Sequence, residues 1–440
     1  MKTDITAISE NIVEFFEKTT LRDHIKKTWL YNENCFVIDF EYKGVKFALD
    51  FTASQPASQP ALNVDLVLRN HLSYFTIKGN AKKECISSGV HLMDALTSSL
   101  EKSISMLNDI DSLFEYDVSV IIPIHNRESL IPECIKSINS QTLSKDNFEV
   151  IFVDDGSTDK SVAAIEYLID PDINYHIIRR EVPSGNASTP RNEGIKSAKG
   201  RYTFFMDSDD FIDESLLENG LNFADKNNSD VVYFKIASSN GRNAPKRAYK
   251  INIVENADIT KNHLFRSMAV FKLFRTSLLR ENNILFNPSI SVGEDKVFMV
   301  QVLSFAERVS ILADKDYYYL TKHDNGHLSG RKFPIEDKYY ILISTLGFIY
   351  FCNKKSDIKA KLYNAWLIIC LEWLSKACTS KGVSESKKRS FFSELSIIFG
   401  AHAELVDKDM IYAKERCLLN PFLRNDYSSF ISAIEMSRIP

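Results

Sequence analysis

Short apolar runs alternate with amphipathic stretches through the middle of the chain. The apolar runs read VSVIIPI, FEVIFV, INYHII, YTFFM and VVYF, and helical patterns such as DKSVAAIEYLI and TPRNEGIKSAKG lie between them. This alternation predicts an α/β fold with a mostly parallel sheet covered by helices on both faces. Because ligands bind beyond the carboxyl ends of the strands in such sheets, we expect the chemistry at that edge.

The pattern differs on either side of this region. Residues 1–116 begin with an amphipathic helix pattern that ends near Lys26, followed by two or three strands in WLYNENCFVIDFEYKGVKFALDF, a polar loop TASQPASQPA and a helix over Val90–Ile110. Residues 331–440 are mainly helical, most clearly in KLYNAWLIICLEWLSKAC. We therefore expect an N-terminal α+β module (1–116), a catalytic domain (117–330) and a C-terminal helical region (331–440).

Composition narrows the function classes. The formal net charge of −4 gives no general attraction to nucleic acid, so any anion site must be local. MKTDITAISENIVEFF has acidic residues where a signal peptide needs an apolar core, which favours a cytoplasmic protein. The apolar run Tyr339–Cys352 is shorter than the roughly 20 residues that span a bilayer, so we expect a buried helix, with contact to a membrane surface left open. Cys352, Cys370 and Cys378 are expected to be buried thiols.

Acidic side chains follow the apolar run YTFFM. Asp207 and Asp209, one position apart at a strand end, can bind a hard divalent cation such as Mg²⁺ or Mn²⁺. The alternative is that Asp210 or Asp213 caps the next helix and the other carboxylates are solvated.

The loop SGNASTPRNEG leads into a helix start. Backbone amides there can bind phosphate, and Arg191 can add a charged fork to a diphosphate. The alternative is a capped helix with a surface arginine, although a cation in the first turn opposes the helix dipole. Neither GxGxxG nor GxxxxGK occurs, so neither a dinucleotide site nor a P-loop is indicated.

Three further positions carry open alternatives. Asp155 ends the second strand and either accepts from a nucleotide base or ribose, or caps the next helix. Glu294 and Asp295 begin an apolar helix, where they either cap it or supply a general base. In HDNGHLSG, His327 is either a metal ligand or an ordinary polar residue.

In this order and spacing, these motifs resemble family-2 glycosyltransferases with the GT-A fold. VSVIIPIHNRESLIPECIKSINSQT resembles the family's first strand and helix, VIFVDDGSTDKS its uracil-contacting segment, and SGNASTPRNEGIKSAKGRYTFFMDSDDFI its loop, Arg-Asn pair and DxD motif. The resemblance is dense over about residues 117–235 and continues through GEDKVF and NGHLS to about 330. The TPRN, GED and HLS segments look most like bacterial enzymes of wall teichoic acid or surface polysaccharide synthesis.

The resemblance also implies residue roles. Asp295 would be the catalytic base, and Asp209 and His327 the metal ligands. The donor site would comprise Pro123, His125, Asn126, Asp155, Asn186, Arg191, Asp207 and Ser208. His125 departs from the pattern, because an aromatic residue often precedes the asparagine of that motif.

The implied reaction is an inverting, metal-dependent transfer of a hexose or N-acetylhexosamine from a nucleotide sugar, expected to be a UDP-sugar, to a hydroxyl of a surface glycopolymer. Mn²⁺ or Mg²⁺ is the implied cofactor. Two alternatives stay open. The acceptor is a peptide side chain that residues 1–110 recognise, or the protein is a non-catalytic carbohydrate-binding scaffold. A nucleotidyltransferase is disfavoured because PIHNRESL has no glycine. The sequence leaves open a homo-oligomer through the C-terminal helices and a position at the inner face of the membrane.

Overall fold

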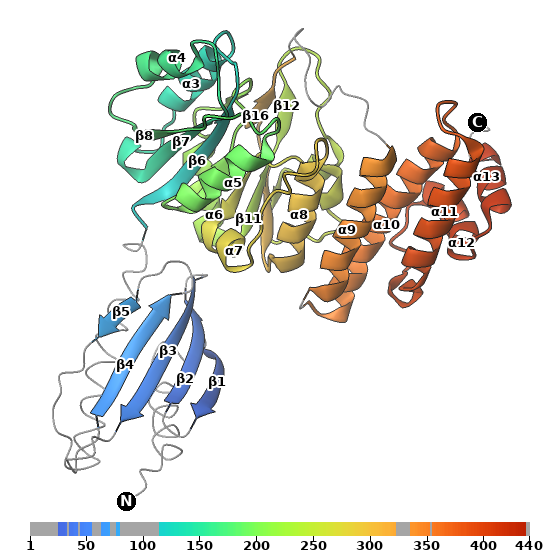
Figure 1. The fold of residues 1–440 in the computed structure, drawn as a ribbon, viewed down its shortest axis with the longest axis horizontal. Helices are drawn as coiled ribbons and strands as arrows, with labels where there is room; N and C mark the ends of the chain where they lie inside the picture. The colour runs from blue at the N-terminus through green and yellow to red at the C-terminus, as the bar shows by residue number, and fades with distance from the viewer. Residues whose placement is uncertain are drawn as a thin grey trace, which may run out of the picture. The chain divides into compact units, whose positions relative to one another are not determined.

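The structure, a computed structural model, divides the chain into two compact units, Met1–Glu115 and Tyr116–Pro440. It describes residues 114–322, 335–352 and 354–436, together with five strands of the first unit. These strands form an antiparallel sheet in chain order: β1 (Ile25–Asn32), β2 (Cys35–Tyr42), β3 (Val45–Ser54), β4 (Asn63–Asn70) and β5 (Thr76–Gly79) (Figure 1). Since β1 begins at Ile25, the expected first helix cannot reach Lys26. The helix expected over Val90–Ile110 lies outside the described residues.

An eight-stranded sheet forms the centre of the second unit. Its order is β13 (Ile253–Val254), β15 (Val309–Leu312), β11 (Val231–Phe234), β14 (Lys272–Arg275), β9 (Gly200–Phe205), β6 (Tyr116–Ile124), β7 (Phe148–Asp154) and β8 (Asn174–Arg179). The pairings make β14 and β13 antiparallel to the other six strands. The sequence pattern did not indicate β14, which is short and begins with a lysine.

Helices cover both faces of this sheet. The connecting helices are α3 (Ile131–Asn139), α4 (Ser161–Leu168), α5 (Ser188–Ser197), α6 (Leu216–Asn227), α7 (Thr276–Glu281) and α8 (Glu294–Phe305). All seven residues of β7 are buried, and Val118–Ile122 in β6 are fully inaccessible, so neither face of these strands meets solvent. The predicted covering of the sheet is confirmed.

A small second sheet lies at the carboxyl edge of the large one. It consists of β10 (Phe211–Ile212), β16 (Tyr318–Leu320) and β12 (Ile236–Ser238). Two 3₁₀ turns, η4 (Arg247–Tyr249) and η5 (Leu264–Arg266), lie in the chain between β12 and β14. This sheet brings Tyr318 next to the acidic residues that follow β9.

The C-terminal part is helical, as expected. It consists of α9 (Ile335–Phe351), α10 (Ser356–Cys378), α11 (Glu385–Gly400), α12 (Ala413–Leu423) and α13 (Tyr427–Met436), and α9 packs against both α8 and α10 (Figure 1). Helix α9 is buried on one face only, since Tyr340 and Phe351 are 50% and 83% exposed. The helix expected to be buried is therefore covered on one face and exposed on the other.

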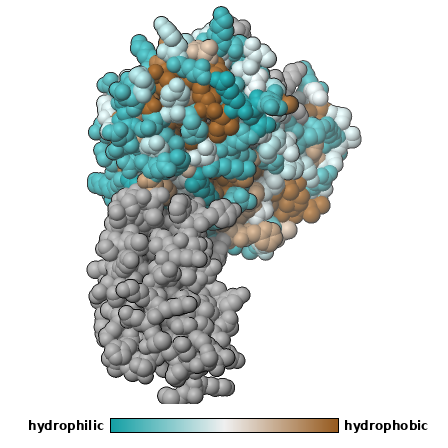
Figure 2. All heavy atoms as spheres, turned by 60° about the vertical axis from the view of Figure 1, so that its left-hand side comes forward, coloured by the Kyte–Doolittle hydropathy of each residue, from teal (hydrophilic) through white to brown (hydrophobic). Residues whose placement is uncertain are grey.

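The remaining composition-based expectations also have outcomes. Cys352, Cys370 and Cys378 are buried free thiols, as expected. None of the described helices combines the length and the apolar character needed to cross a membrane. Figure 2 shows a mostly hydrophilic face of the second unit, broken by hydrophobic patches.

Candidate active site

Three carboxylates gather beyond the carboxyl end of β9. One oxygen from each of Asp207, Asp209 and Asp210 lies within 4.8 Å of the others. Asp207 and Asp209 are partly exposed, whereas Asp210 and Ser208 are buried. Three hard oxygen donors at this spacing suit Mg²⁺ or Mn²⁺, so the residues present fit the predicted metal ion.

Asp210 is the inward-facing member of this cluster. Its carboxylate accepts hydrogen bonds from the Tyr318 hydroxyl and the Thr321 amide, each at 2.8 Å, and Arg242 Nη1 lies 3.6 Å away. Burial raises the pKa of Asp210 to about 8, and the charges of Asp207 and Asp209 act in the same direction. Asp210 therefore does not cap α6.

The turn that leads into α6 is closed by Asp213 instead. Its carboxylate accepts from the Ser215 amide at 3.0 Å and its carbonyl from the Leu216 amide at 3.0 Å, while Lys315 pairs with it at 2.7 Å. The two roles considered from the sequence, cation binding and a structural role before the next helix, thus belong to different residues of this acidic segment. Asp213 has the structural role, and Asp207, Asp209 and Asp210 form the carboxylate cluster.

Arg191 connects the carboxylate cluster to the start of α8. Its Nη2 lies 2.8 Å from Asp207 Oδ1 and its Nη1 3.2 Å from Glu294 Oε1. The side chain is buried and its guanidinium lies 5.2 Å from the centre of the Phe286 ring. Burial alone would lower the pKa of Arg191, but the charges of Asp207 and Glu294 outweigh it and raise the pKa. Arg191 is therefore not a surface arginine.

Glu294 and Asp295 occupy the first turn of α8, after Gly293 with φ of 91°. Burial and the adjacent Asp295 charge raise the pKa of Glu294 against the pull of Arg191. The Asp295 side chain is 29% exposed and lies 3.3 Å from Lys296 Nζ. Glu294 thus belongs to the buried ion network, whereas Asp295 remains accessible to a molecule bound at the site.

Asp155 accepts hydrogen bonds from the loop after β8 and does not cap the helix after β7. Its carboxylate accepts from the Ser184 amide at 2.9 Å, the Ser184 hydroxyl at 2.8 Å and Arg180 Nε at 2.9 Å. Asp154 and Asp159 make the local turn and helix-start hydrogen bonds instead. Asp155 therefore fixes the loop that carries the small-residue segment.

The other residues predicted to bind the nucleotide-sugar donor lie on the same carboxyl edge of the large sheet. His125 Nδ1 is 2.8 Å from the Asp155 carbonyl oxygen, and Asn126, at φ of 53°, accepts from the Thr158 amide at 2.8 Å. Asn186 Oδ1 accepts from the Ser188 amide at 2.9 Å at the start of α5. Pro123 precedes them at the end of β6. His327 lies outside the described residues, so its predicted role as a metal ligand stays a prediction.

Sequence reasoning missed several residues that complete this site. Tyr318 and Arg242 reach Asp210 from distant parts of the chain, and no local pattern marks them. Arg180 could have been found, because it directly follows the strand INYHIIR as the other candidate residues follow theirs. Lys272 begins β14, is completely buried and lies with its Nζ 4.3 Å from the centre of the Tyr233 ring; among the described residues, it is linked to the site only through the charge of Asp295.

Comparisons with known proteins agree with this geometry. The family described as Glycosyl transferase family 2 matches residues 119–282. The poly(ribitol-phosphate) beta-glucosyltransferase of Bacillus spizizenii is 35% identical over 311 residues, which are 70% of this chain and 48% of that protein. TarP of Staphylococcus aureus, a poly(ribitol-phosphate) beta-N-acetylglucosaminyltransferase, is 33% identical over 245 residues, or 55% of this chain and 73% of TarP. The chain thus spans about half the length of the Bacillus relative.

A solved structure supports the fold. The crystal structure of S. aureus TarS 1–349 in complex with UDP-GlcNAc superposes with a TM-score of 0.65 at 28% identity. The superposition covers 73% of this chain and 91% of that one. The predicted GT-A arrangement, a central mostly parallel sheet between helices followed by a helical region, is confirmed.

Proposed function

Because this chain belongs to glycosyl transferase family 2, we propose that it transfers a hexose or N-acetylhexosamine from a UDP-sugar to a hydroxyl of a poly(ribitol-phosphate)-like surface polymer. The observation that carries this proposal is the Arg191 bridge, which holds the carboxylate cluster and the Asp295 turn on one edge of the sheet. The UDP-GlcNAc complex of TarS supports the donor class, and the names of the relatives support the acceptor class.

In this proposal the roles follow from the placement of each side chain. Asp295, partly exposed in the first turn of α8, takes the proton from the acceptor hydroxyl, which attacks the anomeric carbon in a single inverting displacement. Asp209, with Asp207 beside it, would hold a divalent cation, and that cation would stabilise the charge that develops on the diphosphate. Arg191 pairs with Asp207 and Glu294 and so holds the two acidic segments next to each other.

The donor-binding roles of the remaining residues are part of the proposal. Asp155 orders the Arg180–Ser184 loop beside the proposed uracil position. His125 and Asn126 join the segment after β7, at Asp155 and Ser157, to the end of β6. Pro123, Asn186 and Ser208 complete the proposed contacts to the nucleotide and the ribose, and Asn186 also accepts from the Ser188 amide at the start of α5. We place the reaction at the cytoplasmic face of the membrane, with Mn²⁺ or Mg²⁺ as the cation.

The test is a transfer assay with UDP-glucose and UDP-GlcNAc as donors and ribitol-phosphate oligomers as acceptors. Wild type should give a β-linked product, and Asp295→Asn should lower kcat by about 10²–10⁴ while it still binds UDP. A peptide acceptor in place of the oligomer tests the alternative acceptor class. If no UDP-sugar supports transfer or hydrolysis, the proposed activity is wrong.

A further inference from the structure

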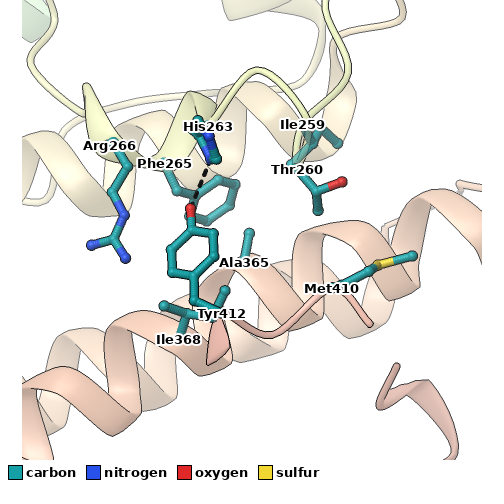
Figure 3. A pocket seen from close by; sticks show the side chains of 9 residues that line it. All are labelled: Ile259, Thr260, His263, Phe265, Arg266, Ala365, Ile368, Met410 and Tyr412. Carbon is teal, nitrogen blue, oxygen red and sulfur yellow. Dashed lines mark hydrogen bonds between the residues drawn. The ribbon is translucent and has the colours of Figure 1, made fainter. Parts of the chain in front are cut away.

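The ring of Tyr412 lies among cationic side chains where the helical region meets the catalytic part of the second unit. Arg247 and Arg266 place their guanidinium carbons 5.7 Å and 5.1 Å from the ring centre. The Tyr412 hydroxyl lies 2.8 Å from His263 Nδ1, as the dashed line in Figure 3 shows. A pocket opens beside this group, walled by Thr260 and by residues of α10 and the turn before α12.

Two acidic side chains here, Glu372 and Glu415, both act on Arg266. Arg266 is neutralised by a two-pronged pair with Glu372, at 2.8 Å and 2.7 Å. Arg247 and Lys250 are exposed, and within the described part of the chain neither has an acidic partner within 4.0 Å. Burial lowers the pKa of His263, and the positive charges of Lys250, Arg247 and Arg266 lower it further. The imidazole therefore lies in a positive electrostatic environment.

The two exposed cations are held on a fixed turn. Between them lie Ala248 and Tyr249, which are both buried, and the Tyr249 hydroxyl lies 2.7 Å from Ser267 Oγ. Because the middle of the turn is anchored in the core, Arg247 and Lys250 project from its ends with little backbone freedom. An anion bound between them would therefore meet cations that are already in place.

The same segment begins at the active site. Arg242 Nη1 lies 3.6 Å from Asp210 Oδ1 and donates to the Thr321 carbonyl at 3.2 Å. Arg247 lies five positions after Arg242, a backbone span of at most about 18 Å. One extended acceptor could thus place a hydroxyl in the active site and a charged group at Arg247.

We propose that Arg247, Lys250 and His263 form an acceptor subsite that binds a phosphodiester group of the polymer while a nearby polyol unit occupies the active site. The proposal rests on the proposed function, since it assigns a place to the phosphates of that acceptor. A guanidinium pairs with phosphate oxygens through two hydrogen bonds, and a bound phosphate also offsets the mutual repulsion of Arg247 and Lys250. His263, whose pKa is lowered, would contribute a neutral imidazole. The net negative chain thus has a local site for an anionic substrate.

The test uses Arg247→Gln, Lys250→Gln and the double variant with a ribitol-phosphate oligomer, and free ribitol as the uncharged acceptor. Each single variant should raise the KM for the oligomer about tenfold, because one lost charged hydrogen bond is worth roughly a factor of ten. Neither variant should change the KM for the UDP-sugar or the rate with ribitol. Lys136→Gln, which removes an exposed charge from α3, is the matched control.

Each outcome separates the subsite from the activity. Unchanged KM for the oligomer in the double variant, or an equal loss with free ribitol, would overturn the subsite and leave the proposed function standing. Wild type that hydrolyses UDP-sugar but transfers nothing to any ribitol-phosphate oligomer would overturn the acceptor class and with it the subsite. The KM effect should also shrink as salt rises, since exposed charge contacts are screened.

Discussion

Arg191 and Glu294 form an ion pair at 3.2 Å across 103 residues of sequence. The pair joins the first turn of α5 to the first turn of α8 and places Asp295 on the sheet edge that carries Asp207. Two carboxylates share this one guanidinium, so a single side chain connects the predicted cation site with the turn that carries the predicted base.

Arg191→Met should destabilise the protein by on the order of 3 kcal/mol, because it leaves two carboxylates without their buried counter-charge. Arg191→Lys keeps the charge but not the fork, so it should be less destabilising yet still lower kcat. Urea unfolding and transfer kinetics of the two variants measure these effects. In the double variant Arg191→Met/Glu294→Gln part of the stability should return, and strictly additive losses would contradict the bridge.

Much of the catalytic edge could be predicted from the sequence. The candidate residues follow buried strands directly, so local apolar runs were enough to place Asp155 and Asp209 on one edge. The interactions between distant segments were not predictable in this way. Tyr318 reaches Asp210 across 108 residues, and nothing in its own neighbourhood marks it as a partner.

Other errors have local physical causes. The strand β14 was missed because Lys272 breaks the apolar run, although the ammonium lies on the face of the Tyr233 ring in the folded protein. For α9, the apolar run in the sequence predicts burial but does not show which face of the helix is covered. In the structure Phe351 is exposed. The domain boundaries and the roles of the site residues stay predictions.

Removal of one carboxylate should separate cation binding from folding. In Asp209→Ala, the UDP-induced rise in melting temperature that depends on Mn²⁺ should disappear, because ligand binding stabilises only the folded state that can bind it. The unliganded melting temperature should stay close to that of wild type, since the carboxylate is partly exposed. A Mn²⁺-dependent shift of wild-type size in this variant would rule out Asp209 as a cation ligand.

Gly200 permits the close approach of β9 to β6. A Cβ at this position would lie 2.4 Å from the Ser119 backbone nitrogen and 2.6 Å from the Val118 carbonyl carbon. Since the obstructing atoms are backbone, Gly200→Ala should destabilise the protein by about 1–3 kcal/mol and weaken UDP binding. Gly347→Ala in α9, where nothing lies within 4 Å, is the control and should stabilise the helix by about 0.5–1 kcal/mol.

Lys272 gives a stability effect whose dependence on pH has a definite sign. Burial lowers the pKa of Lys272 to about 7, against the opposite pull of Asp295, whereas the unfolded chain keeps a lysine near 10.5. Between these two pKa values the unfolded state binds more protons than the folded state, so stability rises with pH. The loss of folding stability caused by Lys272 is therefore largest below about pH 7 and disappears as pH rises towards 10.5.

Lys272→Met should therefore be more stable than wild type at pH 6–7, by on the order of 1–4 kcal/mol, because a well-packed apolar side chain replaces a buried charge. The advantage should decline as pH rises from 7 to 10, and urea unfolding of both proteins across this range measures it. Lys136→Met, on the exposed face of α3, should show no such trend. A Lys272→Met variant that is less stable than wild type at pH 6 would mean that the ammonium makes a favourable buried interaction, and its contacts with the Ala269 carbonyl and the Tyr233 ring would be the ones to examine.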